Sequence, residues 1–294
     1  MRTTSTEPGQ PEQPEQSPAG QPAGIRAGRN LPAAIAVGVI MGGGALVPLL
    51  TVKATFLIYM GIALAIGLHE LTGALRSREI RIPAIPVLAG GAAMVTSAYW
   101  AAGGAVAAAF ALTLIAILAW RLPGGADGYV KDVTGAIFAA SYLALPGATV
   151  AAMLAPADGG RRVLTFVILT VCSDIGGYFA GITLGRGGAH KMAPTISPKK
   201  TWEGLAGSAL AVVAAGVICF MALLHGHWWQ GAITGIAAVA AAVLGDLAES
   251  MIKRDLGIKD MGSLLPGHGG ILDRLDSLLI CAPVVWLLLE AFLR

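Results

Sequence analysis

Four acidic side chains lie at the adjacent ends of two apolar segments in the C-terminal part of the chain. Asp246 and Glu249 close the first segment, and Asp273 and Asp276 open the second. Each pair is spaced i, i+3, so its two members share one face of a predicted helix. A carboxylate inside an apolar segment is costly, so it indicates either a functional position or a neutralised or paired structural group. The pattern suits Mg²⁺, which takes one or two carboxylates and completes its shell with water and substrate phosphate.

A polar, basic and glycine-rich loop joins these two acidic faces. Residues 254–270 read RDLGIKDMGSLLPGHGG, and Ser250 and Lys253 share the helical face of Asp246 just before the loop. Two metal ions held at such faces would clamp the attacking and leaving oxygens of a displacement at phosphorus. The loop therefore indicates a phosphate-bearing ligand that binds together with a hard cation.

A second basic loop, residues 185–204, reads GRGGAHKMAPTISPKKTWEG. Adjacent lysines such as Lys199 and Lys200 are suited to a polyphosphate chain. Pro194 and Pro198 stiffen the loop, as expected if its lysines must hold a position. The alternative is a basic loop that only sets the membrane orientation of the chain, and the composition of the loop leaves both interpretations open.

The elements that must position these residues are membrane helices. Only 13% of the 294 residues are charged, against about 25% in ordinary soluble domains. Hydrophobic residues make up 55% of the chain, and the mean hydropathy is +0.72. These values exclude a soluble fold, a disulfide scaffold and a coiled coil, and they predict an all-α, polytopic integral membrane protein. The net charge of +3 gives no reason to expect nucleic-acid binding.

Apolar segments long enough to cross a bilayer predict about nine transmembrane helices. They cover residues 31–50, 54–75, 84–100, 104–120, 133–154, 163–184, 204–224, 229–249 and 271–293. Residues 1–30 are rich in Pro, Gln and Glu, which predicts a disordered cytoplasmic tail before a transmembrane catalytic domain at 31–294. A further carboxylate, Glu70, lies within the second segment and has no assigned role.

The distribution of basic residues predicts the orientation. With nine spans, 15 of the 20 Lys and Arg residues fall on the side of the N-terminus and the even-numbered loops, and 4 fall on the other side. By the positive-inside rule, the N-terminus and both basic loops are cytoplasmic. Fusing the third and fourth segments into one span would abolish this asymmetry. We therefore expect a multi-pass protein of the cell (inner or plasma) membrane with a cytoplasmic active site.

The loop between the acidic faces carries a family resemblance. Residues 250–276, SMIKRDLGIKDMGSLLPGHGGILDRLD, resemble the signature of the phosphatidate cytidylyltransferases, the CDP-diacylglycerol synthases. Three further segments look like that family: SDIGGYFAG at 173–181, ISPKKTWEG at 196–204 and GDLAES at 245–250. At the level of motifs the resemblance covers residues 165–290.

The resemblance implies a nucleotidyltransferase of phospholipid biosynthesis. Phosphatidic acid and CTP would give CDP-diacylglycerol and pyrophosphate, with Mg²⁺ as cofactor in the form of one ion or two. The partners that it implies are CTP, phosphatidic acid and the lipid bilayer, and it also suggests a homodimer.

The chemistry of that reaction divides the polar residues of these motifs into three groups. The predicted metal ligands are Asp174, Asp246 and Asp273. Predicted catalytic residues, which bind metal or neutralise phosphate, are Asp246, Lys253, Arg254, Lys259, Asp260, His268, Asp273, Arg274 and Asp276. Predicted substrate-binding residues, which donate to phosphate or let the backbone approach it, are Ser197, Lys199, Lys200, Ser250, Gly267, Gly269 and Gly270.

Two other functions compete with this interpretation. One is a CTP-dependent kinase or cytidylyltransferase that acts on a different lipid, such as a polyprenol or isoprenoid, and reuses the same metal site. The other is a cation-coupled transporter that uses Asp174 and Asp246. A transporter predicts acidic residues near the middle of the membrane, whereas most acids and basic motif residues here cluster at predicted cytoplasmic ends.

Overall fold

The computed structural model describes residues 31–101, 104–185, 190–264 and 269–293. The predicted tail and the predicted site residues Gly267 and His268 lie outside these ranges, as does the side chain of Lys199.

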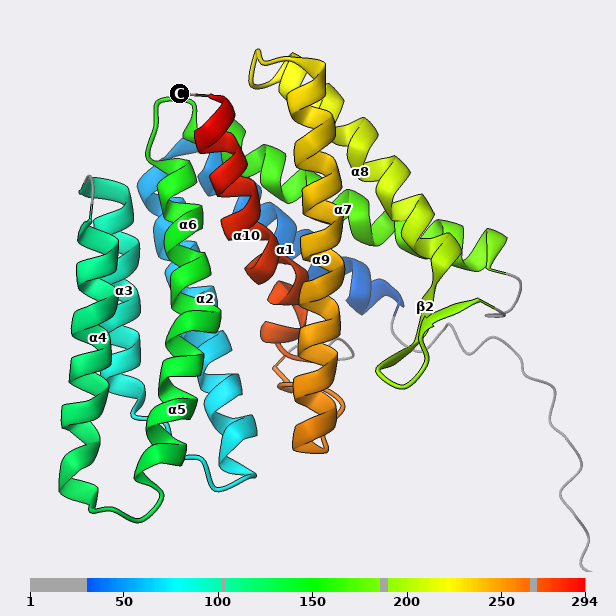
Figure 1. The fold of residues 1–294 in the computed structure, drawn as a ribbon. Helices are drawn as coiled ribbons and strands as arrows, with labels where there is room; N and C mark the ends of the chain where they lie inside the picture. The colour runs from blue at the N-terminus through cyan, green and yellow to red at the C-terminus, as the bar shows by residue number, and fades with distance from the viewer. Residues whose placement is uncertain (1–30, 102–103, 186–189, 265–268, 294) are drawn as a thin grey trace, which may run out of the picture.

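Helices make up most of the described chain, which confirms the all-α prediction (Figure 1). In order, they are α1 Leu31–Thr51, α2 Lys53–Arg76, α3 Ala84–Trp100, α4 Ala105–Arg121, the short 3₁₀ turn η1 Leu122–Gly124, α5 Tyr129–Ala139, the π-helical turn η2 Ala140–Ala144, α6 Leu145–Leu154, α7 Gly159–Leu184, α8 Trp202–Ala222, α9 Trp228–Leu256 and α10 Leu272–Phe292. The loop between α7 and α8 contains an antiparallel hairpin of β1 Lys191–Ala193 and β2 Ser197–Thr201.

Seven helices in the described ranges are long and apolar enough to cross a membrane, and α5, η2 and α6 count together as one of them. This confirms a polytopic membrane protein. Two shorter apolar helical stretches, Gly42–Thr51 and Ala84–Trp100, complete the predicted series of segments. The predicted third and fourth segments are separate helices, α3 and α4. The total of nine spans stays a prediction.

The helix ends alternate between two sides of the molecule. In Figure 1 the connections after α2, α4 and α9 lie at the lower side, and the β-hairpin extends towards that side from the outer ends of α7 and α8. The turns before α7 and α9 lie at the upper side, beside the end of α10. All the predicted even-numbered loops therefore share one side, which agrees with the predicted topology. That this side is cytoplasmic stays a prediction.

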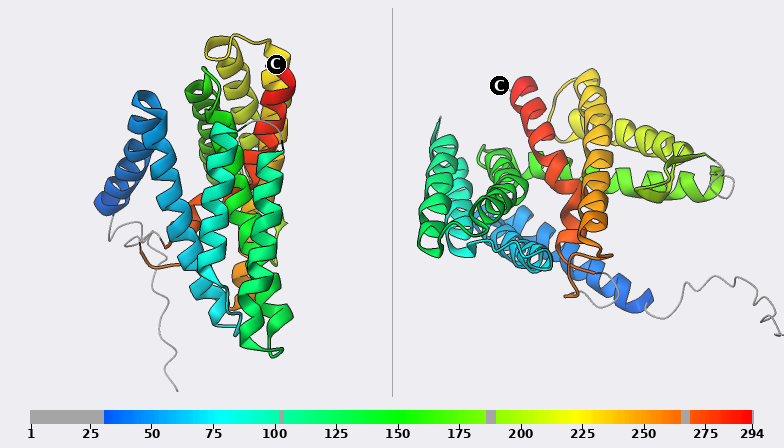
Figure 2. Two further views of the ribbon diagram at one scale, coloured as in Figure 1. Left: turned by 90° about the vertical axis from the view of Figure 1, so that its left-hand side faces the viewer. Right: turned by 60° about the horizontal axis from the view of Figure 1, so that its bottom comes forward.

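The last four helices form the part of the fold that carries the motifs. Figure 2 shows α7 and α8 projecting together to one side, α3 and α4 on the other, and α9 and α10 between them. Small residues allow these helices to approach closely, as membrane helices require when lipid removes the hydrophobic drive. A Cβ on Gly207 of α8 would lie 2.2 Å from the Cβ of Ala180 on α7.

The contact between α9 and α10 depends on Gly245 in the same way. A Cβ at this position would lie 2.6 Å from the backbone oxygen of Asp276. Because Asp246 follows directly, the absence of a side chain at Gly245 brings the acidic faces of the two helices together.

Adding one methyl group at this contact will destabilise the fold. We expect Gly245→Ala to lower the free energy of unfolding by about 1–3 kcal/mol, since backbone atoms of α10 must move aside. Gly61→Ala is the matched control, because a Cβ there meets no atom within 4 Å. The measurement is the thermal unfolding midpoint of each variant in detergent. Equal midpoints for the two variants would show that the contact is not tight.

Candidate active site

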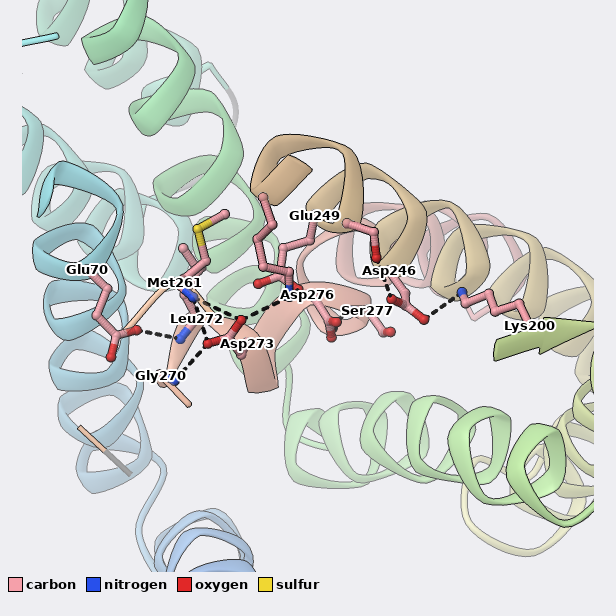
Figure 3. Close-up of polar contacts among 12 residues, drawn as sticks. Glu70, Lys200, Asp246, Glu249, Met261, Gly270, Leu272, Asp273, Asp276 and Ser277 are labelled. Atoms are coloured by element: carbon pink, nitrogen blue, oxygen red, sulfur yellow. Dashed lines mark hydrogen bonds and ion pairs between the residues drawn. The ribbon is translucent and has the colours of Figure 1, made fainter. Parts of the chain in front are cut away.

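A polar cavity of about 340 Å³ lies where α7, α8, α9, α10 and the hairpin meet. Its lining includes Asp174 from α7, Ser197 and Lys200 from β2, Asp246 from α9 and Ser277 from α10. Figure 3 shows Lys200 and Asp246 pointing toward one another, and their Nζ and Oδ2 atoms are 2.6 Å apart. Lys200 and Asp246, 46 residues apart in the sequence, therefore bring the basic loop and the first acidic helix face to one cavity.

The hairpin is held in place at both ends. At its end, the Thr201 hydroxyl accepts a hydrogen bond from the Gly204 amide and so caps the first turn of α8. At its turn, the Ile196 carbonyl accepts a bond from the Arg254 guanidinium at the end of α9. These contacts position Lys200 over the cavity.

The carboxylates around the cavity influence one another electrostatically. Asp174 lies within electrostatic range of Asp246 and Asp276, and also of Lys200 and Arg274. The side chain of Asp246 is 37% exposed, and the Ser250 hydroxyl makes a long bond of 3.4 Å to its Oδ1. Asp246 therefore stays accessible to a ligand in the cavity while Lys200 balances its charge.

Asp273 has different surroundings, because its side chain is only 5% exposed. Lys253 Nζ donates to its Oδ1 at 2.9 Å, and the amides of Met261 and Gly270 donate to its Oδ2 at 3.0 and 2.7 Å (Figure 3). The same ammonium lies 3.1 Å from Glu249, which is fully buried. In this structure Asp273 thus anchors the loop after α9, and it is absent from the lining of the polar cavity. Its predicted roles as metal ligand and catalytic residue stay predictions.

Glu70 is a site residue that motif reasoning did not assign. Its carboxylate, from α2, accepts hydrogen bonds from the amides of Ile271 and Leu272 at 3.0 and 2.8 Å. A negative charge at a helix N-terminus is favourable, so Glu70 stabilises the first turn of α10. A Cβ on Gly270 would lie 2.4 Å from Glu70 Oε2, so only glycine leaves room for the carboxylate there. The one available signal was an acid within an apolar segment.

The remaining predicted residues surround these two groups. Lys259 and Asp260 are exposed on the loop after α9, and Arg274 is exposed on the first turn of α10. Gly269 has a φ of 78° and lies against Asp273, so it combines a left-handed backbone with a close approach. Asp276 lies close enough to Glu249 for the two carboxyl groups to interact. Within the described ranges, no three His, Cys, Asp or Glu side chains form a ready-made metal site.

Comparison with known proteins decides the family. The model of the cytidylyltransferase family matches residues 32–292, which is nearly the whole chain. This chain belongs to the cytidylyltransferase family. It is 39% identical to the phosphatidate cytidylyltransferase of Mycobacterium bovis over 98% of this chain and 99% of that protein. It is 40% identical to the phosphatidate cytidylyltransferase of Mycobacterium tuberculosis over 95% of this chain and 88% of that protein.

Shorter matches cover less of the chain. A phosphatidate cytidylyltransferase of Brucella suis is 41% identical over 44% of this chain and 47% of that protein. The family match extends well beyond the motif region, from α1 to the end of α10. The resemblance carried by residues 250–276 is therefore confirmed, and it includes the N-terminal helices that bear no motif.

Glu70→Gln will weaken the start of α10. A carboxamide can accept one of the two backbone bonds, and its NH₂ group then faces the second amide. We expect a loss of about 1–3 kcal/mol in the free energy of unfolding. Glu79→Gln is the control, since the Glu79 side chain is 90% exposed. Thermal unfolding of the two variants in the same detergent measures the difference, and a stable Glu70→Gln would contradict the capping role.

Proposed function

We propose that this protein transfers the cytidylyl group of CTP to phosphatidic acid, which gives CDP-diacylglycerol and pyrophosphate for phospholipid biosynthesis. The observation that carries this conclusion is the similarity to mycobacterial phosphatidate cytidylyltransferases over nearly the whole chain. The polar cavity supports it, because Lys200, Ser197 and the two carboxylates of Asp174 and Asp246 converge there from separate motifs.

The reaction needs positioning and charge neutralisation more than proton transfer. A phosphate oxygen of phosphatidic acid attacks the α-phosphorus of CTP, the bond to the β-phosphate oxygen breaks, and pyrophosphate leaves. The nucleophile is already an anion, so no strong general base is required. Catalysis then comes from holding both substrates in line and stabilising the charge on the phosphoryl oxygens.

Lys200 and Ser197 on β2 bind the triphosphate of CTP in the polar cavity. In the structure Lys200 is paired with Asp246, and this pair is accessible from the cavity. An incoming phosphate is a second partner for the ammonium, which releases the Asp246 carboxylate. Lys253 is already engaged by Asp273 and Glu249, so its charge stabilises the site without direct substrate contact.

The acids of the cavity fit a hard cation. Asp246, with Asp174 and Asp276 nearby, offers the carboxylate oxygens that Mg²⁺ prefers, and substrate phosphate and water complete such a shell. Asp273 is the further candidate ligand from the motif. When bound, one or two Mg²⁺ ions supply neutralisation of the phosphate charge. Asp246 and Asp174 would hold such an ion, and the Lys200 ammonium binds phosphate beside them.

The orientation and assembly belong to the same proposal. We place the cavity on the cytoplasmic side of the cell membrane, because most basic residues fall on the side of the even-numbered loops. A homodimer remains part of the proposal, and its test is the mass of the detergent-solubilised protein.

Activity tests the proposal directly. We expect purified protein in detergent to release pyrophosphate and form CDP-diacylglycerol from phosphatidic acid, CTP and Mg²⁺. Excess EDTA should stop the reaction, and added Mg²⁺ should restore it. A polyprenol or isoprenoid acceptor distinguishes the alternative lipid enzymes. Absence of product from phosphatidic acid across several chain lengths and divalent metals would overturn the assignment.

Asp246 and Asp273 will respond differently to neutralisation. Asp246→Asn removes a group that faces the cavity, so we expect kcat to fall about 100-fold with little change in thermal unfolding. Asp273→Asn removes the partner of Lys253 and weakens two backbone bonds, so both activity and the unfolding midpoint will fall. Asp127→Asn, on an exposed loop, controls for loss of charge alone. A large loss of stability in Asp246→Asn would contradict this division.

A further inference from the structure

A second cavity touches the first turns of α10. It has a volume of about 250 Å³ and is lined by α1, α2, α6, α7 and α10, with side chains such as Phe56, Phe166 and Leu278. Its lining is mostly apolar, with Tyr59 as well, and Arg274 is the one charged residue there among the residues described. The right-hand view of Figure 2 shows α1 and α2 beside the lower end of α10, where this cavity lies.

The two cavities meet the same turn of α10. Ser277 lines the polar cavity, and Arg274, three residues earlier, lines the apolar one. Residues three apart on a helix have Cβ atoms about 5–6 Å from each other. Arg274 is also within electrostatic range of Asp174, which lines the polar cavity. A phosphate on Arg274 would therefore lie at the border between the two cavities.

An apolar cavity alone does not identify a lipid-binding site in a membrane protein. A third cavity, which is also apolar, serves for comparison. It has a volume of about 510 Å³ and lies between α2, α3 and the segment of α5 and η2, and none of the described residues that line it is charged. It has no group to hold an anionic headgroup. The second cavity differs from the third because Arg274 contributes a guanidinium group. Such a group can pair with phosphate through two parallel hydrogen bonds.

We propose that the second cavity receives the part of one acyl chain of phosphatidic acid nearest the headgroup, while Arg274 binds the phosphate of the lipid. This inference rests on the proposed function and identifies where the lipid substrate lies. From Arg274 to Ala282 the lining extends over about 12 Å of α10 and passes the level of Ser277. The phosphate oxygen that attacks CTP is then presented beside Ser277 and Asp174, and the chain stays in the apolar interior.

The test is a pair of substitutions on the same helix. Ala63 lines the second cavity and Ala65 lines the third, and both side chains are partly buried. Ala63→Phe fills the second cavity, whereas Ala65→Phe puts the same ring into the third. We expect Ala63→Phe to raise the KM for dioleoyl phosphatidic acid about tenfold, with the KM for CTP unchanged. Ala65→Phe should leave both constants unchanged.

Binding without turnover separates this inference from the proposed function. Dioleoyl phosphatidic acid in detergent micelles should raise the melting temperature of the wild-type protein more than dioleoyl phosphatidylcholine does. Ala63→Phe should abolish that difference and Ala65→Phe should keep it, and Arg274→Gln should make the two lipids equivalent. If Ala63→Phe does not fold, Ala63→Leu takes its place.

Several results would overturn the site. They are equal stabilisation of the wild type by both lipids, equal effects of the two phenylalanine variants, or an unchanged response in Arg274→Gln. A selective response to phosphatidic acid without pyrophosphate release would support the lipid site and reject the transferase activity. Pyrophosphate release with no difference between the phenylalanine variants would support the transferase activity and reject the lipid site.

Discussion

A largely buried ion pair is the contact on which the candidate site depends. Lys253 lies 2.9 Å from Asp273 and 3.1 Å from Glu249, so one ammonium balances carboxylates from both α9 and α10. Asp273 is only 5% exposed, and a buried charge that loses its partner costs about 3–5 kcal/mol. The ion pair therefore holds α9 and α10 together at their acidic faces. It favours the close approach of the two helix backbones that Gly245 allows.

The path of the signature loop follows from that pair. Asp273 also accepts bonds from Met261 and Gly270, so both sides of the loop return to one carboxylate. Glu70 then ties the last part of the loop to α2. A helix from the N-terminal half, which carries no recognisable motif, thus determines where α10 starts. This is a physical reason for the family match to extend over residues 32–292 and beyond the motif region.

Hydropathy predicted the helix ends well where burial of apolar side chains in lipid or core determines them. It predicted them less well where polar contacts determine the ends. The predicted segment 204–224 is α8 with a shift of two residues at each end. The predicted segment 229–249 is α9, but the helix continues to Leu256 through a polar stretch. That extension exists because Lys253 is stabilised by Asp273, which is 20 residues further along the chain. The hairpin of β1 and β2 was expected only as a stiffened loop, since its register depends on pairing between Lys191 and Thr201.

In the candidate site, too, residue spacing predicted which acids belong to the site, but tertiary contacts determine the role of each. Spacing placed Asp246 and Asp273 on acidic helix faces and treated them alike. The folded chain separates them, because Asp246 is 37% exposed beside Lys200 and Asp273 is 5% exposed beside Lys253. In an ion pair that faces a cavity, the ammonium can bind a ligand phosphate in place of its carboxylate partner. The enclosed pair of Lys253 and Asp273 has three further hydrogen-bonding or charged partners, and separating it would cost the free energy of all these contacts. The same two residue types therefore supply a binding surface in one place and a rigid support in the other, and no local pattern distinguishes them.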